Sequence, residues 1–500
     1  MGALVFREVG FAYEGGVALL SEASFRLAPG VYGVVGENGA GKTTLLRLAS
    51  GELAPDSGEV MVLPRGGRVV GCPQTAEVPG EDVESLLAAT DGEALFLCAR
   101  MGVERRGIER WGELSFGERR RIPVAAALWR EPEILLVDEP TNHLDSEARE
   151  AVIEGLRGFR GVALVVSHDR GLLDAVCTGT LRVRGGRVDV SGLPYSQARA
   201  EWEREEEARG VERERRVQAR DAAQKKLAEA RDRRAQAEGM RSSKRRMKNA
   251  KDHDARGLGA KFRVERAEHR LGQLVGARRS EALRAEEAVG AFEGERKVGR
   301  SVFVGYEAAP RARVLWLEAG VVRAGERAVL RDVSLGVGRT DRIHVKGVNG
   351  AGKTTLLRAL VEASGMGAER MLYLPQDMTA REAEGLLREV RSLEPGARGR
   401  TLSLVAALGV DPGRLLSSQA PSPGEARKLS LAMSLGRRVW ALVLDEPTNH
   451  LDLPSIERLE AALREYPGAL VVVSHDARFA GRVTTATWTV RGGRVHLGEG

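Results

Sequence analysis

The eleven residues LLVDEPTNHLD, Leu135–Asp145, return almost unchanged as LVLDEPTNHLD at Leu442–Asp452. Each copy begins with an apolar run that ends in Asp-Glu, which is typical of a parallel strand buried on both faces. The sequence VVSHD follows each copy and places a histidine, His168 or His475, thirty residues after the Asp of the Asp-Glu pair. Two copies kept in one register indicate the duplication of a whole domain of about 190 residues.

The residues ahead of each copy predict a site for nucleotide phosphates. GENGAGKTT at Gly36–Thr44 and GVNGAGKTT at Gly347–Thr355 both fit the pattern G-x-x-x-x-G-K-[ST]. The apolar run VYGVV precedes the first loop, and TTLLRLASG follows it with the apolar spacing of a helix. Strand, glycine-rich loop and helix together bring backbone N–H groups around phosphate oxygens at a helix N-terminus. The core of each repeat is therefore predicted to be α/β.

The polar residues shared by the two repeats predict a Mg²⁺-dependent ATPase. ATP hydrolysis needs a lysine on the β- and γ-phosphates, a hydroxyl and a carboxylate for Mg²⁺, and a group that polarises the attacking water. A histidine can also contact the γ-phosphate. These roles fall, in this order, to Lys42, Thr43, Asp138, Glu139 and His168, and in the second repeat to Lys353, Thr354, Asp445, Glu446 and His475. Further expected ATP contacts are Gly36, Asn38, Gly39, Gly41, Thr44, Gly347, Asn349, Gly350, Gly352 and Thr355.

Cysteine usage and hydropathy argue against several classes of protein. The three cysteines, Cys72, Cys98 and Cys177, are scattered and form no CxxC pair. A disulfide framework, a zinc ribbon and an iron–sulfur cluster are therefore not expected, and a reducing cytoplasm is. The longest apolar runs are far shorter than the roughly 20 residues of a membrane helix, and the N-terminus has no signal pattern. A soluble cytoplasmic protein is expected.

The positive charge is concentrated in one part of the chain. The net charge is +7. Residues 201–300 hold 28 Lys and Arg against 20 Asp and Glu, and within them residues 241–270 hold 11 against 4. Such a window predicts a localised contact with a polyanion.

The segment between the repeats predicts a long helical hairpin. No proline occurs between Pro194 and Pro310, and the strong helix formers Glu, Arg, Ala, Lys and Gln dominate. A second run carries a thin apolar stripe with the 3–4 spacing of a coiled-coil seam, formed by Val264, Leu271, Leu274, Val275, Leu283, Val289 and Phe292. We expect two antiparallel helices with a basic tip at about 241–261, and domains at 1–194, 195–310 and 311–500. Phosphate-rich RNA is the natural partner of such a tip.

With these motifs the sequence resembles the ATP-binding cassette (ABC) superfamily. LSFGE at Leu114–Glu118 and PSPGE at Pro421–Glu425 stand where that family has its signature motif. Gln74 and Gln376 stand at its Q-loop glutamine, which the resemblance also places near Mg²⁺. Tyr13 stands where an aromatic ring stacks on adenine.

The resemblance implies that two cassettes face each other head to tail, so that each ATP lies between the phosphate loop of one and the signature of the other. Site one then joins the catalytic residues of the first cassette to Ser422, Gly424 and Glu425. Site two joins those of the second cassette to Ser115, Gly117 and Glu118. The chain is expected to be a monomer with this intramolecular ATP sandwich.

The doubled DEPTNHLD and the charged hairpin resemble the ABC-F subfamily, whose members are ATPases that bind the ribosome at or near the tRNA exit site. The resemblance implies the 70S ribosome and tRNA as partners, with no membrane domain. It implies RNA contacts by the basic tip, for which the candidates are Arg241, Lys244, Arg245, Arg246, Lys248, Lys251, Arg256 and Lys261.

Several positions depart from the family pattern. Phe116 replaces the first glycine of one signature, and Pro421 replaces the leucine of the other. Arg323 aligns with Tyr13, so site two lacks its aromatic ring and is expected to be the weaker site. About forty residues separate Gln74 from the first signature, too few for the arm insertion of some ABC-F translation factors, and no long C-terminal extension follows RGGRVHLGEG. The missing arm and the compact tip favour protection of the ribosome against antibiotics over general tuning of translation.

Three other classes remain as alternatives. A transport ATPase would co-purify with a membrane permease, and a DNA-repair or chromosome ATPase would be stimulated by DNA and not by ribosomes. A ribosome-binding module without hydrolysis is disfavoured because both Glu139 and Glu446 are present.

Overall fold

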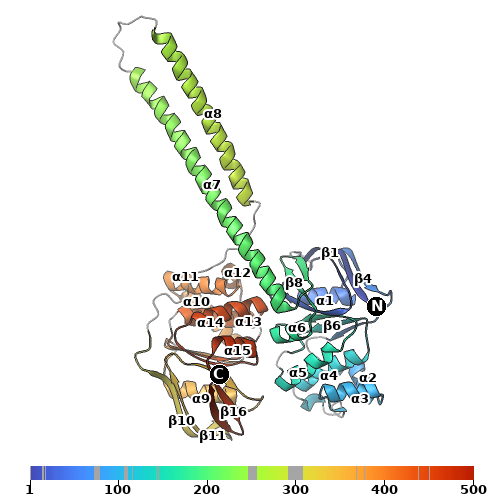
Figure 1. The fold of residues 1–500 in the computed structure, drawn as a ribbon. Helices are drawn as coiled ribbons and strands as arrows, with labels where there is room; N and C mark the ends of the chain where they lie inside the picture. The colour runs from blue at the N-terminus through green and yellow to red at the C-terminus, as the bar shows by residue number, and fades with distance from the viewer. Residues whose placement is uncertain are drawn as a thin grey trace. The chain divides into compact units, whose positions relative to one another are not determined.

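The structure is a computed structural model that describes residues 2–13, 16, 18–72, 79–105, 111–114, 116–141, 144, 146–245, 256–290, 308–367, 369–376, 378–436, 439–449 and 451–499. Contacts divide the chain into two compact units, of which one is Met1–Ala198 with Gly299–Gly500 and the other is Arg199–Val298. The first unit holds both cassettes and the second holds most of the helical hairpin (Figure 1). Within the described residues no helix is long and apolar enough to cross a membrane.

The first cassette is built on a six-stranded sheet with the order β5-β6-β7-β3-β8-β9. Its strands are parallel except for β9 at the edge, and they span Gly30–Gly36 (β3), Val69–Cys72 (β5), Ile134–Asp138 (β6), Val162–Val166 (β7), Gly179–Arg184 (β8) and Arg187–Ser191 (β9). A smaller antiparallel sheet has the order β2-β1-β4 and consists of Ala3–Phe11 (β1), Leu20–Leu27 (β2) and Ser57–Leu63 (β4).

Helices follow the strands of this cassette as an α/β fold requires. They are Lys42–Ser50 (α1), Glu81–Ala88 (α2), Gly92–Arg100 (α3), Phe116–Trp129 (α4), Ser146–Arg157 (α5) and Arg170–Val176 (α6), with a short 3₁₀ turn at Trp111–Glu113. The Asp of VVSHD caps the next helix, since the Asp169 side chain accepts hydrogen bonds from the N–H groups of Gly171 and Leu172.

The second cassette repeats this arrangement with the sheet order β13-β14-β15-β12-β16-β17. Its strands are Arg342–Lys346 (β12), Met371–Leu374 (β13), Ala441–Asp445 (β14), Ala469–Val473 (β15), Ala486–Arg491 (β16) and Arg494–Glu499 (β17), beside a hairpin of Arg313–Ala324 (β10) and Arg327–Gly338 (β11). Its helices are Lys353–Ser364 (α9), Ala380–Ser392 (α10), Pro395–Ala407 (α11), Pro412–Ser417 (α12), Pro423–Gly436 (α13), Leu453–Glu465 (α14) and Ala477–Val483 (α15).

The apolar runs read from the sequence are buried strands, as predicted. Every residue of β6, β7, β14 and β15 is buried. In the first cassette β6, β7 and β3 are neighbours, and in the second β14, β15 and β12 are. Because parallel strands present their carboxyl ends at one edge, the residues that follow these three strands meet there, which is where open α/β sheets bind ligands.

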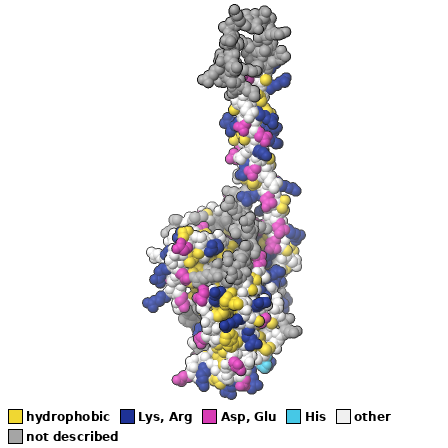
Figure 2. Space-filling view, turned by 90° about the vertical axis from the view of Figure 1, so that its left-hand side faces the viewer, with side chains coloured by type: hydrophobic (Ala, Val, Ile, Leu, Met, Phe, Trp, Pro, Cys, Tyr) yellow, Lys and Arg dark blue, Asp and Glu magenta, His cyan; other side chains and the backbone are white. Residues whose placement is uncertain are grey.

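The segment between the cassettes forms the predicted helical hairpin, with α7 at Tyr195–Arg245 and α8 at Arg256–Gly290 (Figure 1). The 51 residues of α7 correspond to about 75 Å of helix. The helices run antiparallel, because Arg216 Nη1 donates to the Ala288 carbonyl and Lys226 pairs with Glu281. Figure 2 shows basic and acidic side chains mixed along the hairpin. Pairs four residues apart, such as Arg199–Glu203, account for part of this pattern.

The predicted apolar stripe of α8 is only partly buried, because Leu271, Val275 and Val289 are half-buried while two of its leucines are exposed. Leu283 is 51% exposed and Leu274 is 37% exposed. The side chains of Val264 and Phe292 lie outside the described ones. Beyond the start of α7, where Tyr195, Ala198 and Trp202 are buried, the buried side chains among the described ones are alanines, Ala223 and Ala230 on α7 and Ala282 on α8. Small residues let two helices approach closely, and the larger leucines then project beside the contact.

Candidate functional site

The first phosphate loop joins β3 to α1 and has the geometry of an anion cradle. Gly41 precedes α1 with φ 102°, a left-handed conformation that favours glycine. Lys42 Nζ donates to the carbonyls of Gly36 and Glu37 at 2.9 and 3.0 Å, so the loop wraps around the lysine. Burial lowers the pKa of Lys42, although neighbouring carboxylates oppose the effect. A phosphate entering this loop would meet a cation already in place.

The second phosphate loop has the same form and opens into a cavity. Gly352 also has φ 102°, and Lys353 Nζ donates to the carbonyls of Gly347 and Val348 at 2.8 and 3.2 Å. The cavity measures about 480 Å³. The predicted site residues that line it are Asn349, Gly350, Gly352, Lys353, Thr354, Thr355, Gln376, Asp445, Glu446 and His475. Residues predicted from four separate motifs are thus brought together.

Asp138 and Asp445 end strands β6 and β14 beside the phosphate loops. Thr43 Oγ1 donates to Asp138 Oδ2 at 3.0 Å. Burial raises the pKa of both aspartates, and the Thr43 and Thr354 hydroxyls oppose part of the rise. Among the described residues neither carboxylate oxygen of Asp445 has a hydrogen-bond partner with good geometry. A buried carboxylate with open acceptor positions next to a hydroxyl suits Mg²⁺, which takes few protein ligands and completes its shell with phosphate and water.

The described residues contain no cluster of three or more His, Cys, Asp or Glu side chains that could hold a metal alone.

Glu139 and Glu446 follow the two aspartates in an unusual backbone conformation. Their φ values are 51° and 48°, in the left-handed region that non-glycine residues rarely adopt. Both side chains are buried. Burial and the neighbouring Asp138 raise the pKa of Glu139 to about 8, and burial raises that of Glu446 to about 7. Strain and a raised pKa at one residue are typical of a catalytic position.

Each glutamate is paired with the histidine of the adjoining strand. His168 Nε2 lies 3.2 Å from Glu139 Oε1, and His475 Nε2 lies 3.4 Å from Glu446 Oε1. The backbone N–H groups of His168 and His475 also donate to the Glu139 and Glu446 carboxylates. Burial, followed by the charge of Lys42, lowers the pKa of His168 to about 3, so its imidazole is neutral and orients the carboxyl group without an ionic charge.

Two arginines that sequence reasoning missed hold the glutamates from the helix after each signature. Arg120 Nε donates to the Glu139 carbonyl at 3.2 Å, and Arg427 Nη1 donates to the Glu446 carbonyl at 2.7 Å. Both arginines are buried. They stand two residues after Glu118 and Glu425, and this repeated spacing is the signal that could have identified them.

Two residues of the second signature hydrogen-bond to each other. The Ser422 hydroxyl and N–H both donate to Glu425 Oε2, at 2.7 and 2.8 Å, and the Glu425 N–H returns a bond to Ser422 Oγ. Gly424 lies in the first turn of α13. In the first signature Gly117 and Glu118 lie in the first turn of α4. Ser115, Gln74 and the side chain of Phe116 lie outside what the structure describes.

The aromatic ring expected at the adenine is present at Tyr13, which is 46% exposed and stands edge-on to Phe11 at 5.1 Å. Its hydroxyl lies 3.4 Å from Thr44 Oγ1. In the second cassette the aligned Arg323 does not line the cavity and instead donates to the Glu326 carbonyl. Arg327 lines the cavity in its place. The pairing of β10 with β11 shifts between Val322 and Arg323, and such an irregularity re-aims the side chain.

Residues of the second cassette contact the first phosphate loop. Asp452, the N-cap of α14, accepts a hydrogen bond from the Asn38 N–H at 2.7 Å. Arg458 of the same helix lies 3.2 Å from Glu37 Oε1. The polar contacts described for Ser422 are with Glu425, so the pairing of each phosphate loop with the opposite signature stays a prediction.

The predicted RNA contacts cannot be placed as side chains. Arg246, Lys248 and Lys251 lie outside the described residues. The backbone of α7 includes Arg241, Lys244 and Arg245, and that of α8 includes Arg256 and Lys261, but the side chains of these residues lie outside those described.

Comparisons with known proteins agree with this geometry. A family model described as "ABC transporter" matches residues 20–142 and 330–449. The chain is 34% identical to the "Tylosin resistance ATP-binding protein TlrC" of Streptomyces fradiae, over 95% of each chain. It is 27% identical to the "Ribosome protection protein VmlR" of Bacillus subtilis, over 91% of this chain and 81% of that one. It is also 27% identical to the "Energy-dependent translational throttle protein EttA" of Escherichia coli K12, over 93% and 88%.

The fold is similar to a solved structure described as "RNase-L Inhibitor", with a TM-score of 0.58, 19% identity, and coverage of 99% of this chain and 90% of that one. At this identity the likeness supports the fold alone. The relative that shares a third of its residues over nearly its whole length, together with the doubled motifs and the hairpin, defines the family. This protein belongs to the ABC-F group of tandem ATP-binding cassette proteins and is an ATPase.

Proposed function

We propose that this ATPase acts on the ribosome and protects it from antibiotics that inhibit translation. The observation that carries the proposal is the 34% identity to a tylosin resistance protein over 95% of both chains. The relative described as a ribosome protection protein, also aligned over most of its length, supports the ribosome as the partner.

We propose two composite ATP sites with Mg²⁺ at each. Lys42 and Lys353 bind the β- and γ-phosphates, and the Thr43–Asp138 and Thr354–Asp445 pairs bind the metal with Gln74 and Gln376. Glu139 and Glu446 polarise the attacking water, and His168 and His475 orient them. Mg²⁺ supplies charge neutralisation between the phosphates. The opposite signature, Ser422 with Gly424 or Ser115 with Gly117, completes each site.

In this proposal the hairpin carries the contact with ribosomal RNA or tRNA. Its shaft, residues 201–240, holds 11 basic and 11 acidic residues, whereas residues 241–270 hold 11 basic and 4 acidic ones. A neutral shaft with a basic end suits a structure that reaches toward phosphate groups, because backbone contacts supply most of the affinity for nucleic acid.

A general translation factor is the second candidate, and the alignment with a translational throttle protein over 93% of this chain favours it. The two roles differ in when they matter, because a factor that tunes elongation acts without any drug. The short stretch between Gln74 and Leu114, whose described residues form α2 and α3, supports protection over tuning.

Antibiotic susceptibility tests the proposal directly. Cells that express the protein and cells that lack it are compared on inhibitors of the peptidyl-transferase centre and exit tunnel, beginning with tylosin. We expect the minimal inhibitory concentration to rise at least four-fold for one drug class, and translation in extracts to recover in parallel. Lys42→Ala with Lys353→Ala is the matched control and should give no protection. Slower growth without drug, and no protection against any drug, would assign the protein to general translation.

A further inference from the structure

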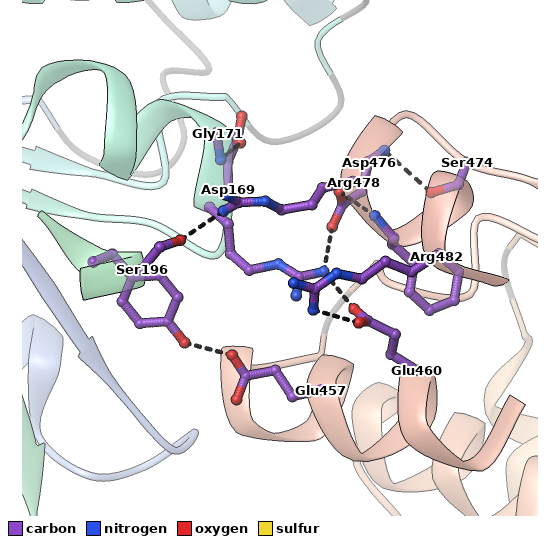
Figure 3. A network of polar contacts seen from close by, with 12 residues as sticks. Asp169, Gly171, Ser196, Glu457, Glu460, Ser474, Asp476, Arg478 and Arg482 are labelled. Carbon is purple, nitrogen blue, oxygen red and sulfur yellow. Dashed lines mark hydrogen bonds and ion pairs between the residues drawn. The ribbon is translucent and has the colours of Figure 1, made fainter. Parts of the chain in front are cut away.

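Polar contacts between the two cassettes involve Glu460, Asp476 and Arg478 of the second cassette (Figure 3). Arg170, the first residue of α6, is 2% exposed. Its Nη2 lies 2.9 Å from Glu460 Oε2 on α14 and 3.4 Å from Asp476 Oδ2, the N-cap of α15. Burial alone would lower the pKa of Arg170, but Asp476 and Glu460 outweigh it and the pKa is raised. One cation of the first cassette is thus held by two anions of the second.

Two further ion pairs join the same elements. Arg478 of α15 lies 2.6 Å from Asp174 Oδ2 on α6 and also donates to Ser196 Oγ. Arg458 of α14 reaches Glu37 in the first phosphate loop. Tyr195, at the start of α7, donates its hydroxyl to Glu457 at 2.7 Å. All these contacts join α14 and α15 of the second cassette to the first phosphate loop, α6 and the start of α7.

The duplicated sequence shows what stands at the equivalent positions on the other side. The two copies align without a gap from Asp138 to Thr180, so the network residues on α6, α14 and α15 have counterparts in the other cassette. The Arg170–Glu460 pair corresponds to Ala477 and Ile153, and the Arg478–Asp174 pair to Gly171 and Gly481.

The third pair follows the same rule. Glu37 corresponds to Val348 in the second phosphate loop, and Arg458 corresponds to Ala151. All six counterparts of these three pairs are therefore uncharged, and both members of each pair are replaced together. Asp476, the second partner of Arg170, corresponds to Asp169, but Arg170 itself corresponds to Ala477. An ion pair at any of the three equivalent positions is chemically impossible.

The first phosphate loop contacts the second cassette, whereas Asp145, the counterpart of Asp452 for the second loop, lies outside the described residues. Asn38 and Glu37 of the first loop are contacted by Asp452 and Arg458 of the second cassette. The cavity at the second loop is lined, among the described residues, by the second cassette alone. Gly117 and Glu118, which are expected opposite that loop, are not among the residues that line it.

We infer that Arg170, Arg458 and Arg478 are positioning residues that form a one-sided ionic latch between the cassettes. The latch holds α14 and α15 against the first cassette beside site one. None of the three ion pairs can form at the equivalent positions beside site two, which opens and closes while the latch holds. Site one is therefore pre-assembled, and nucleotide exchange is expected to be faster at site two. This inference rests on the two composite ATP sites of the proposed function.

The latch predicts that its loss weakens ATP binding at site one and spares site two. In Lys353→Ala protein the loop of site one remains intact, and in Lys42→Ala protein that of site two does. Arg478→Ala and Asp174→Asn, neither of which is in a phosphate loop, are introduced singly and together into both backgrounds. We expect each single change to raise the Kd for ATP at site one about two- to five-fold, the double change to add little, and site two to stay within two-fold.

Arg170 is tested by a conservative and a non-conservative variant. Arg170→Ala leaves Glu460 and Asp476 without their shared cation and should raise the Kd of site one about ten-fold or more, whereas Arg170→Lys should recover part of the loss. Val348→Glu with Ala151→Arg transfers the third pair to the other side. We expect this transplant to lower the Kd for ATP at site two at least two-fold and to slow nucleotide release there.

Three outcomes would overturn the latch: equal losses at both sites, additive effects of Arg478→Ala and Asp174→Asn, or a transplant that leaves the Kd and nucleotide release of site two unchanged. If neither Lys42→Ala nor Lys353→Ala alters ATP binding, the assignment of the two sites fails instead. A fluorescent ATP analogue and folded-protein controls by circular dichroism separate these cases from simple misfolding.

Discussion

Burial places the two catalytic candidates between their acid and base forms near neutral pH, since the pKa is about 8 for Glu139 and about 7 for Glu446. A carboxyl group in water would be almost fully ionised at this pH. Glu139 and Glu446 can therefore lose their protons readily when a cation binds beside them. His168, beside Glu139, is neutral, so it adds no positive charge that would lower the pKa of Glu139.

The raised pKa predicts the pH dependence of hydrolysis. A group that polarises water must be deprotonated, so a pKa raised from its usual value moves the rising limb of the profile to higher pH. We expect kcat/KM, which reports the free enzyme, to rise between about pH 6 and pH 9 with a midpoint near 7 to 8. Steady-state ATPase rates measured across this range test it. A rising limb centred below pH 5 would exclude Glu139 and Glu446 from this role.

Removing the charge of both glutamates predicts a trapped state. In Glu139→Gln with Glu446→Gln the phosphate loops are unchanged, so ATP should bind, but the water is no longer polarised. We expect kcat to fall at least 100-fold and the variant to remain on 70S ribosomes with ATP bound. Sedimentation with labelled ATP measures this retention. Hydrolysis at the parent rate would show that another group acts as the base.

At the scale of elements, the hairpin separates a shaft of balanced charge from a basic end, and this separation predicts how it binds. Changing Arg245, Arg246, Lys248 and Lys251 to Glu should abolish protection in cells and flatten the salt dependence of ribosome binding, because phosphate contacts release counterions. The matched control reverses four exposed shaft residues, Arg215, Lys225, Arg231 and Arg233. If the tip and shaft variants behave alike, the tip has no special role.

The elements that the sequence predicted are those with a strong local signal. The apolar runs of β6 and β14, the glycine loops and the proline-free helices each follow from their own residues, and their motifs repeat. Their common edge then brings Lys353, Thr354, Asp445, Glu446 and His475 to one cavity. Parallel strand topology explains this convergence.

The details that the sequence did not predict depend on partners distant in the chain. An irregular pairing of two residues turns Arg323 away from the cavity and leaves Arg327 on its lining. Arg120 and Arg427 lie on helices 19 residues before the carbonyls of Glu139 and Glu446 to which they donate, so no local pattern predicts these hydrogen bonds. The spacing of apolar residues on α8 also did not predict that Leu283 is exposed, because the two helices pack closely at alanines instead.

At the scale of the whole molecule, the two phosphate loops of the duplicated cassettes have different surroundings. The Tyr13 hydroxyl lies 3.4 Å from Thr44 Oγ1 at the first loop, whereas none of the described residues that line the cavity at the second loop is Phe, Tyr or Trp. Phe116 in the signature expected at site two adds bulk where the family has glycine.

This inequality predicts different affinities for ATP. A ring stacked on a base contributes about 1–3 kcal/mol, so its absence should weaken nucleotide binding about ten-fold or more. We expect Lys353→Ala protein, in which only the loop of site one is intact, to bind ATP more tightly than Lys42→Ala protein. Equilibrium titration with ATP measures both. Tighter binding by Lys42→Ala protein would reverse the proposed order.

The left-handed backbone of Glu139 and Glu446 affects the balance between folding stability and activity in this protein. A left-handed conformation costs a non-glycine residue about 1–2 kcal/mol, and a buried carboxyl group adds a desolvation cost. Glutamine removes the charge but keeps the backbone strain, while glycine would remove both. Each cassette therefore carries these costs at the residue that we propose as its catalytic base. A search for thermostable variants would be drawn to these two positions and would yield robust proteins without turnover.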